Sequence, residues 1–185
     1  MWELFAMWTW IPIFLIASFA VAGVADAAMS SLVAFFVVAV GGVASAVAGA
    51  LADRIGRTAT TMAAMAVSGS SAVLAGVLFG APVALVTTVA LIWGASVIAD
   101  SAQFSTAVSE LAPPGTAGSA LSVQTAVGFT LTSVTILGVG VIDPSGAQGW
   151  RVAWAILAIG PAVGIAAMWR LRRRPDATKM ASGHR

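Results

Sequence analysis

The chain has no cysteine, no tyrosine and a single histidine. Because it has no cysteine, it can form no disulfide and offers no thiolate to a metal ion. The one histidine, His184, lies in a polar stretch at the C-terminus, apart from any pattern of nucleophile and base. No segment has the glycine-rich pattern of a nucleotide-binding loop. We therefore expect no enzymatic activity, no metal centre and no cofactor.

Charge is also scarce. Charged residues make up 9% of the 185 residues, whereas hydrophobic residues make up 59%. A soluble domain carries about 25% charged residues, so this chain has too few to cover a water-facing surface. The sequence predicts an integral membrane protein, whose length is best counted in spans of about 20 residues.

Six apolar stretches are separated by short segments rich in turn residues. Each stretch is long enough to cross a hydrocarbon core about 30 Å thick at a rise of about 1.5 Å per residue. Helices are expected rather than strands, because the stretches lack the strict alternation of a barrel strand and because backbone groups in lipid must bond within their own segment. The predicted fold is all-α, a polytopic bundle of six transmembrane helices within residues 1–170, at 2–22, 31–52, 58–79, 83–109, 117–142 and 152–169.

The basic residues predict the orientation of the bundle. With the N-terminus inside, the positive-inside rule leaves Arg151 alone on the outer side. The remaining basic residues then face the cytoplasm: Arg54, Arg57, Arg170, Arg172, Arg173, Arg174, Lys179 and Arg185. Residues 171–185 are predicted to form a disordered basic tail beside anionic lipid, rather than a nucleic-acid-binding tail. We expect a multi-pass protein of a bacterial-type cell inner membrane, with a cytoplasmic C-terminus and no nucleic-acid partner.

The most specific motif is G-A-L-A-D-R-I-G-R at residues 49–57, between the second and third spans. Gly49 lets a neighbouring helix approach closely, and Gly56 permits a tight turn. Asp53 and Arg57 stand four residues apart and can form an ion pair, or Asp53 can face the positive end of a neighbouring helix. An ordinary basic loop that obeys the positive-inside rule is the other interpretation.

This motif resembles the G-x-L-A-D-r-x-G-R loop of the major facilitator superfamily, which recurs once in each six-helix half of these twelve-helix transporters. The resemblance implies a conformational latch that closes the cytoplasmic side in one state and releases it in the other. By the same resemblance, the residues of the latch are Gly49, Asp53, Arg54, Gly56 and Arg57.

Other stretches resemble the same superfamily. Residues 110–121 are similar to the connection after the fourth span of a half, and residues 2–8 and 99–105 are similar to the first and fourth helices of the C-terminal half in bacterial members. Where an arginine commonly precedes the glycine of that connection, this chain has Ala117, so Glu110 is expected to lack its usual partner. The resemblance covers essentially the whole chain and implies the C-terminal half of a twelve-helix protein.

Asp100 is a charged residue placed deep in the fourth span. It falls about 25 Å from the outer end of that span and about 15 Å from the inner end. A carboxylate at this depth costs about 2.5–3.5 kcal/mol on insertion scales, so it is expected to face a cavity or a partner. Helical spacing places five residues on one face of the span: Trp93, Ser96, Asp100, Gln103 and Ala107. The same depth count places four polar side chains in one layer of the inner half of the membrane: Glu3, Asp100, Gln103 and Gln124.

In the superfamily, the first and fourth helices of each half line the central pathway. The resemblance therefore implies that a substrate or coupling ion approaches Asp100, Gln103, Trp93, Glu3 and Trp10, with Gln124 in the same layer. A poorly solvated carboxylate favours its protonated form, which suits proton coupling. The alternative is that Asp100 and Glu3 only bond to neighbouring helices and fix the packing. Gly160 and Pro161 predict a bend in the last span and are given no functional role.

These observations predict secondary active transport of a small molecule or ion by alternating access, driven by a proton or solute gradient. The pathway would lie between two six-helix units, so the chain alone is expected not to transport and to need a missing N-terminal half. Two alternatives remain. One is a half-size carrier that rebuilds twelve helices as a dimer, and the other is a membrane scaffold that transports nothing.

Overall fold

The computed structural model describes residues 1–181 and contains six long α-helices in that range. They are α1 (Leu4–Val21), α2 (Ala27–Ile55), α3 (Arg57–Val77), α4 (Val83–Leu111), α5 (Ala117–Ile142) and α6 (Ala147–Arg172). Each is long and apolar enough to span a membrane. The predicted fold class is confirmed: the chain is an all-α polytopic membrane bundle.

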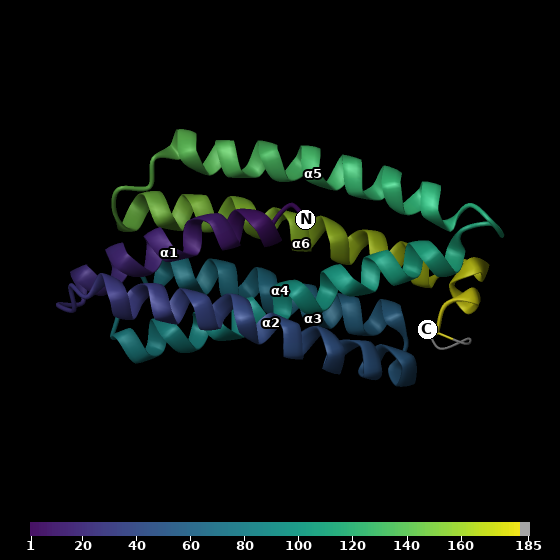
Figure 1. Cartoon of the computed structure of the whole chain (residues 1–185), viewed down its shortest axis with the longest axis horizontal. Helices are drawn as coiled ribbons and strands as arrows, with labels where there is room; N and C mark the ends of the chain where they lie inside the picture. The colour runs from purple at the N-terminus through teal and green to yellow at the C-terminus, as the bar shows by residue number, and fades with distance from the viewer. Residues whose placement is uncertain (182–185) are drawn as a thin grey trace.

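The helices run side by side along the long axis of the molecule (Figure 1). The α2–α3 and α4–α5 links lie at one end together with the C-terminal segment, and the other three links lie at the opposite end. The closest packing joins α3 to α6 and α4, and α2 to α4. Helix α1 packs mainly against α2, α5 and α4, and α5 lies along one edge against α1, α4 and α6.

Helix α1 is shorter than its neighbours. Its 18 residues span about 27 Å, whereas the 29 residues of α2 span about 43 Å. The start of the chain therefore lies between the two ends of the bundle (Figure 1). This places Glu3, the residue before α1, inside the bundle with 4% of its surface exposed.

Helix α2 begins at Ala27, four residues before the start of the predicted span at 31. Asp26 precedes it, and its Oδ1 accepts a hydrogen bond of 2.9 Å from the backbone N–H of Met29. This side chain caps one of the N–H groups that a helix leaves free at its first turn. The cap explains why the helix extends beyond the apolar stretch.

Replacing Asp26 with alanine is expected to destabilise the bundle by about 1 kcal/mol, because the Met29 N–H loses its acceptor. Asp26→Asn is the control, since its side-chain oxygen can still accept this bond. Unfolding in mixed micelles of increasing SDS content, followed by tryptophan fluorescence, would measure both changes. A loss of equal size in the two variants would contradict the capping role.

An aromatic cluster fills the core between α1, α4 and α6. The rings of Trp93 and Trp154 are 5.0 Å apart and nearly perpendicular, and Phe14 packs edge-on against Trp150 and Trp154. All four side chains are fully buried. Their edge-to-face packing fixes how α1 and α6 sit against α4.

The C-terminal segment differs from its prediction. The sequence predicts disorder from residue 171 onward, but α6 continues to Arg172 and a 3-10 turn follows at Pro175–Lys179. Ala177 and Met180 are buried against Ala107, Leu111 and Leu171, and this apolar contact holds the segment at the end of α4. On its exposed side, the hydrogen bond from Lys179 lowers the pKa of the Asp176 carboxyl. The predicted tail residues His184 and Arg185 lie outside the described residues.

Most basic residues gather at the end of the bundle that carries this segment. Of the eight Lys and Arg residues within residues 1–181, only Arg151 lies at the opposite end. The even number of helices is what brings the α2–α3 link and the C-terminal segment to the same end.

Candidate functional site

Arg57 is the centre of a polar cluster at the basic end of the bundle. Its Nε and Nη2 donate to the two oxygens of Glu110 at 2.8 Å each, which is the bidentate geometry that guanidinium and carboxylate groups favour. Nη2 also lies 3.1 Å from Oδ1 of Asp53, and Nη1 donates to Oε1 of Gln103 at 3.1 Å. The backbone N–H of Ala181 donates to Glu110 at 3.3 Å. This cluster, the Arg57 node, joins α2, α3, α4 and the C-terminal segment.

The backbone around Gly56 explains the position of Arg57. Gly56 separates α2 from α3 with a φ of +99°, a conformation that other residues rarely adopt. Helix α3 therefore begins at Arg57, where the helix dipole disfavours a positive charge. The carboxylates of Asp53 and Glu110 offset this penalty. The arginine side chain is 11% exposed, so it is held largely inside the bundle.

Three expectations about this end of the bundle are resolved by the geometry. Glu110 was expected to lack a partner, but this is wrong, because the ends of α3 and α4 meet and Arg57 supplies the charge. Gly49 was expected to admit a neighbouring helix, yet a Cβ built on it would find no atom within 4 Å. The buried face of α2 passes through Ala48 and Ala52 instead. Arg54 is exposed and stands outside the node.

Glu3 connects three elements near the middle of the bundle. One of its oxygens accepts a hydrogen bond of 2.7 Å from Ser68 on α3, and the other accepts a bond of 2.5 Å from Nε1 of Trp93 on α4. These contacts fix the carboxylate in place just before α1 begins. Each oxygen keeps a second lone pair, so the group can still receive a further donor.

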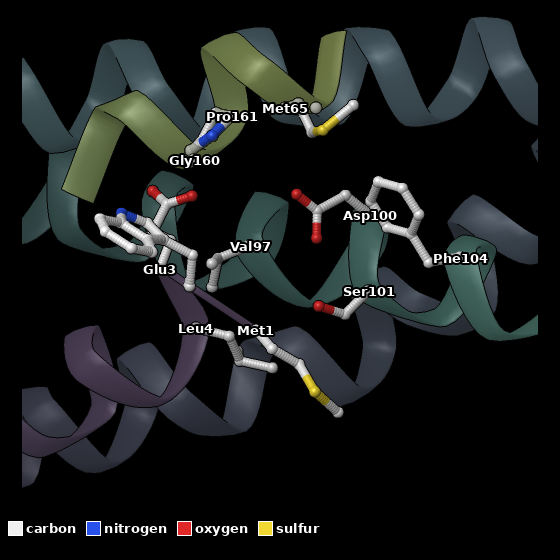
Figure 2. Close-up of a pocket in the computed structure, with 12 residues that line it drawn as sticks. Met1, Glu3, Leu4, Met65, Val97, Asp100, Ser101, Phe104, Gly160 and Pro161 are labelled. Carbon is white, nitrogen blue, oxygen red and sulfur yellow. The ribbon is translucent and has the colours of Figure 1, made fainter. Parts of the chain in front are cut away.

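Glu3 and Asp100 line the same cavity, which has a volume of about 140 Å³. Figure 2 shows the carboxylate of Asp100 directed into this space, on the side that faces Glu3. The remaining lining is mostly apolar and comes from α1, α3, α4, α6 and the residues before α1: Met1, Trp2, Leu4, Met65, Val97, Ser101, Phe104, Gly160, Pro161 and Gly164.

The two carboxylates differ in how they are held. Asp100 is 8% exposed, and apart from its chain neighbour Ser101 it has no hydrogen-bond donor among the side chains of residues 1–181. Glu3 in contrast is bonded across to two helices. Of the two roles weighed for these residues, the packing role fits Glu3, whereas Asp100 faces the cavity without a partner on another helix.

The structure brings together the predicted face of α4 and divides the predicted polar layer. All five residues of that face are buried: Trp93, Ser96, Asp100, Gln103 and Ala107. Only Glu3 and Asp100 of the four layer residues share the cavity. Gln103 lies about one turn further along α4. Its side chain bonds to Arg57 instead, because Nη1 of the guanidinium donates to its Oε1.

Three other predicted site residues do not line this cavity. Trp93 is fully buried in the aromatic cluster and reaches the site only through its bond to Glu3. Trp10 donates from Nε1 to the carbonyl of Ile136, which ties α1 to α5. Gln124 on α5 lines a separate hollow of about 680 Å³ between α1, α4 and α5. Its Oε1 is buried and has no hydrogen-bond partner within residues 1–181.

This hollow adjoins the cavity. The cavity and the hollow share four lining residues: Met1, Leu4, Ser101 and Phe104. These side chains form a shared wall between the two carboxylates on one side and Gln124 on the other, where no packed helix layer intervenes. The rest of the hollow is mostly apolar.

Sequence reasoning missed part of the cavity wall. Gly160 and Pro161 were read as a helix bend alone, but both line the cavity opposite Asp100 (Figure 2). Ser68 was not singled out either, and the sequence carries no signal that a lone serine on α3 would meet Glu3, 65 residues away. Within residues 1–181, no group of three or more His, Cys, Asp and Glu side chains could hold a metal ion.

The fold and the site together define a polytopic membrane protein with an acidic cavity inside the bundle and an ionic node at one end. Comparison of the chain with protein-family models, with curated proteins and with solved structures finds no match.

Proposed function

We propose that this chain is one six-helix unit of a secondary active transporter, which moves a small solute across a membrane by alternating access. The observation that carries the proposal is the pair of carboxylates in one cavity inside an apolar bundle. A charged group at membrane depth costs about 2.5–3.5 kcal/mol on insertion scales. A fold retains such groups where they bind a solute or a coupling ion or where they bond neighbouring helices. Within residues 1–181, Asp100 has no side-chain partner on another helix, which leaves it free for the binding role.

The Arg57 node supports the conformational part of the proposal. It ties α2, α3 and α4 at one end of the bundle through charge-assisted hydrogen bonds, which can break as a unit when the helices separate. Gln103 belongs to the node and stands about one turn from Asp100 on α4. A movement that opens the node therefore also displaces the helix that carries the cavity carboxylate. The resemblance of residues 49–57 to the superfamily loop gives the same assignment.

A transport pathway of this kind lies between two six-helix units. The proposed partner is an N-terminal half of the same protein, with a second copy of this chain as the alternative, and the proposed place is the bacterial cell inner membrane with the basic end in the cytoplasm. Proton or solute gradients are the proposed energy source.

Alternating access is tested with a cysteine at position 101, in a chain that has no other cysteine. Ser101 lines the cavity, and a membrane-impermeant maleimide added to either side of reconstituted vesicles would report which side the cavity opens to. Glu110→Gln removes the negative charge of Glu110 from the Arg57 node. Since hydrogen bonds to charged groups contribute about 1.5–3 kcal/mol, this change is expected to shift the ratio of labelling from the two sides by about tenfold or more.

Asp176→Asn is the matched control, because it removes an exposed carboxylate at the same end of the bundle but outside the node. It is expected to leave the ratio unchanged. If the cysteine at position 101 is labelled from the same side at the same rate in Ser101→Cys and in Ser101→Cys/Glu110→Gln, this would contradict alternating access and favour a scaffold. The labelling would be carried out on the chain alone and on the chain together with an N-terminal six-helix half. A shift with the chain alone would favour a second copy as the partner, and a shift only with the N-terminal half would favour that half.

A further inference from the structure

We propose that the cavity between Glu3 and Asp100 binds the positively charged head of a small organic amine, and that the adjoining hollow holds its apolar part. The inference rests on the proposed function and names the class of substrate. It starts from three features of the site: its charge, its lining and the wall that it shares with the hollow.

The charged groups around the cavity leave it negative. The two carboxylates face it, and among the described residues no lysine or arginine side chain lines it. Arg57 does not line the cavity and is engaged by Glu110, Asp53 and Gln103. Two carboxylates with no basic side chain in the lining leave the cavity negative when both are ionised. A site of low dielectric with this imbalance attracts a cation and repels an anion.

The two carboxylates have complementary parts in such a site. Ser68 and Trp93 hold Glu3 in place, so its carboxylate has a fixed position in the binding site. Asp100 is more than nine-tenths buried and is directed into the cavity (Figure 2), and within residues 1–181 it has no side-chain partner on another helix. Asp100 therefore has acceptor positions left for the N–H groups of a ligand.

The lining favours an organic cation over a bare metal ion. Two carboxylates are too few for the oxygen shell that a hard cation needs. The aromatic rings of Trp2 and Phe104 and the side chains of Met65 and Pro161 surround the carboxylates with apolar surface. An alkylammonium group matches this environment, because its nitrogen pairs with the carboxylate while its carbon atoms contact the apolar wall and the aromatic faces.

The adjoining hollow sets the shape of the ligand. The cavity of about 140 Å³ has room for a small head group only, whereas the hollow of about 680 Å³ is larger and mostly apolar. They share a wall at Ser101 and Phe104. When the side chains of this shared wall move aside, a ligand with a cationic head and a short apolar chain would fill both spaces.

The test compares reagents of opposite charge at the same cysteine. In the full chain with Ser101→Cys, the rates of modification by a trimethylammonium-ethyl and by a sulfonatoethyl methanethiosulfonate are measured in detergent micelles. The ratio of cationic to anionic rate at position 101 is divided by the ratio at Ser119→Cys, an exposed position at the start of α5. We expect the corrected ratio to be about tenfold in favour of the cation. Asp100→Asn in the Ser101→Cys chain is expected to reduce it several-fold.

Protection by a ligand probe tests the amine directly. Butylammonium is expected to slow the modification of position 101 in the Ser101→Cys chain that keeps Asp100, whereas butan-1-ol and butyrate are not. This comparison needs no change at Asp100, so it remains decisive if Asp100→Asn does not fold. Asp143→Asn is the matched control for the substitution, because Asp143 is exposed at the opposite end of the bundle in a left-handed conformation that asparagine tolerates.

The outcomes separate this inference from the proposed function. A corrected ratio near one, or equal protection by butan-1-ol and butylammonium, overturns the assignment of an organic cation. If that happens while Glu110→Gln still shifts the side from which position 101 is labelled, transport stands and only the substrate class falls. Cation preference without any such shift keeps the binding site and removes alternating access.

Discussion

Arg57→Ala is expected to lower the free energy of unfolding by about 3 kcal/mol. The substitution leaves the Glu110 carboxylate, which is 25% exposed, with only the N–H of Ala181 as a donor. Removing one partner of a largely buried ion pair costs about 3–5 kcal/mol, and the partial exposure of Glu110 places this case at the lower limit. Arg57→Lys should recover less than half of the loss, because an ammonium group cannot make the two parallel bonds to Glu110.

Arg54→Ala is the matched control, since Arg54 lies three residues earlier in the same motif, at the end of α2, but is exposed and outside the node. It is expected to change stability by less than about 0.5 kcal/mol. Unfolding in mixed micelles would give both values, and the Arg57→Ala/Glu110→Ala double-mutant cycle would give the coupling between the two side chains. A coupling energy near zero would show that the node does not hold the helices together.

Gly94→Ala is expected to destabilise the bundle by about 2 kcal/mol. A Cβ on Gly94 would lie well inside van der Waals distance of the backbone carbonyl oxygen of Val37, so α2 and α4 would have to move apart. Overpacking of this kind costs about 1–3 kcal/mol, and occasionally more when backbone must move. The gain of about 1 kcal/mol in helix propensity offsets only part of that cost.

Gly42→Ala provides the comparison on the partner helix. No atom lies within 4 Å of the position of its Cβ, so the substitution should be neutral or slightly stabilising through helix propensity. The pair would be measured by unfolding in mixed micelles, and in the Ser101→Cys chain the labelling rate would report on the cavity wall that α4 provides. If Gly94→Ala proved as stable as Gly42→Ala, the close approach of α2 and α4 would be refuted.

The small-residue pairs visible in the sequence did not identify this contact. Ser45 and Gly49 follow the spacing of a tight helix interface, but a Cβ on Gly49 would meet nothing. Gly94, which has no glycine partner at that spacing, approaches the backbone of α2 instead. In a chain rich in glycine and alanine, spacing on one helix does not specify which face the neighbouring helix covers.

The residues of the node and the cavity were predictable to different degrees. The Asp53–Arg57 pair was predicted from a spacing of four residues, and the structure forms it at 3.1 Å, but across the turn at Gly56 and not along one helix. The burial of Asp100 follows from its depth in an apolar span. Glu110 could have been assigned to Arg57 from topology, because an even number of spans brings the two to the same end. The positions of Ser68 and Pro161 beside the carboxylates could not be predicted, since they depend on how α3 and α6 are rotated about their own axes.

The sequence by itself determined that this protein lies in a membrane, that it crosses it with six helices, and that acidic groups are carried inside the bundle. Composition and the length of apolar stretches are sufficient for these conclusions, because the bilayer imposes them on every segment separately. The tertiary structure decided which polar groups meet: Arg57 with Glu110, Glu3 with Ser68 and Trp93, and Asp100 with an open cavity. Those partners come from helices far apart in the chain, and their meeting depends on crossing positions and rotations that packing sets for the whole bundle at once.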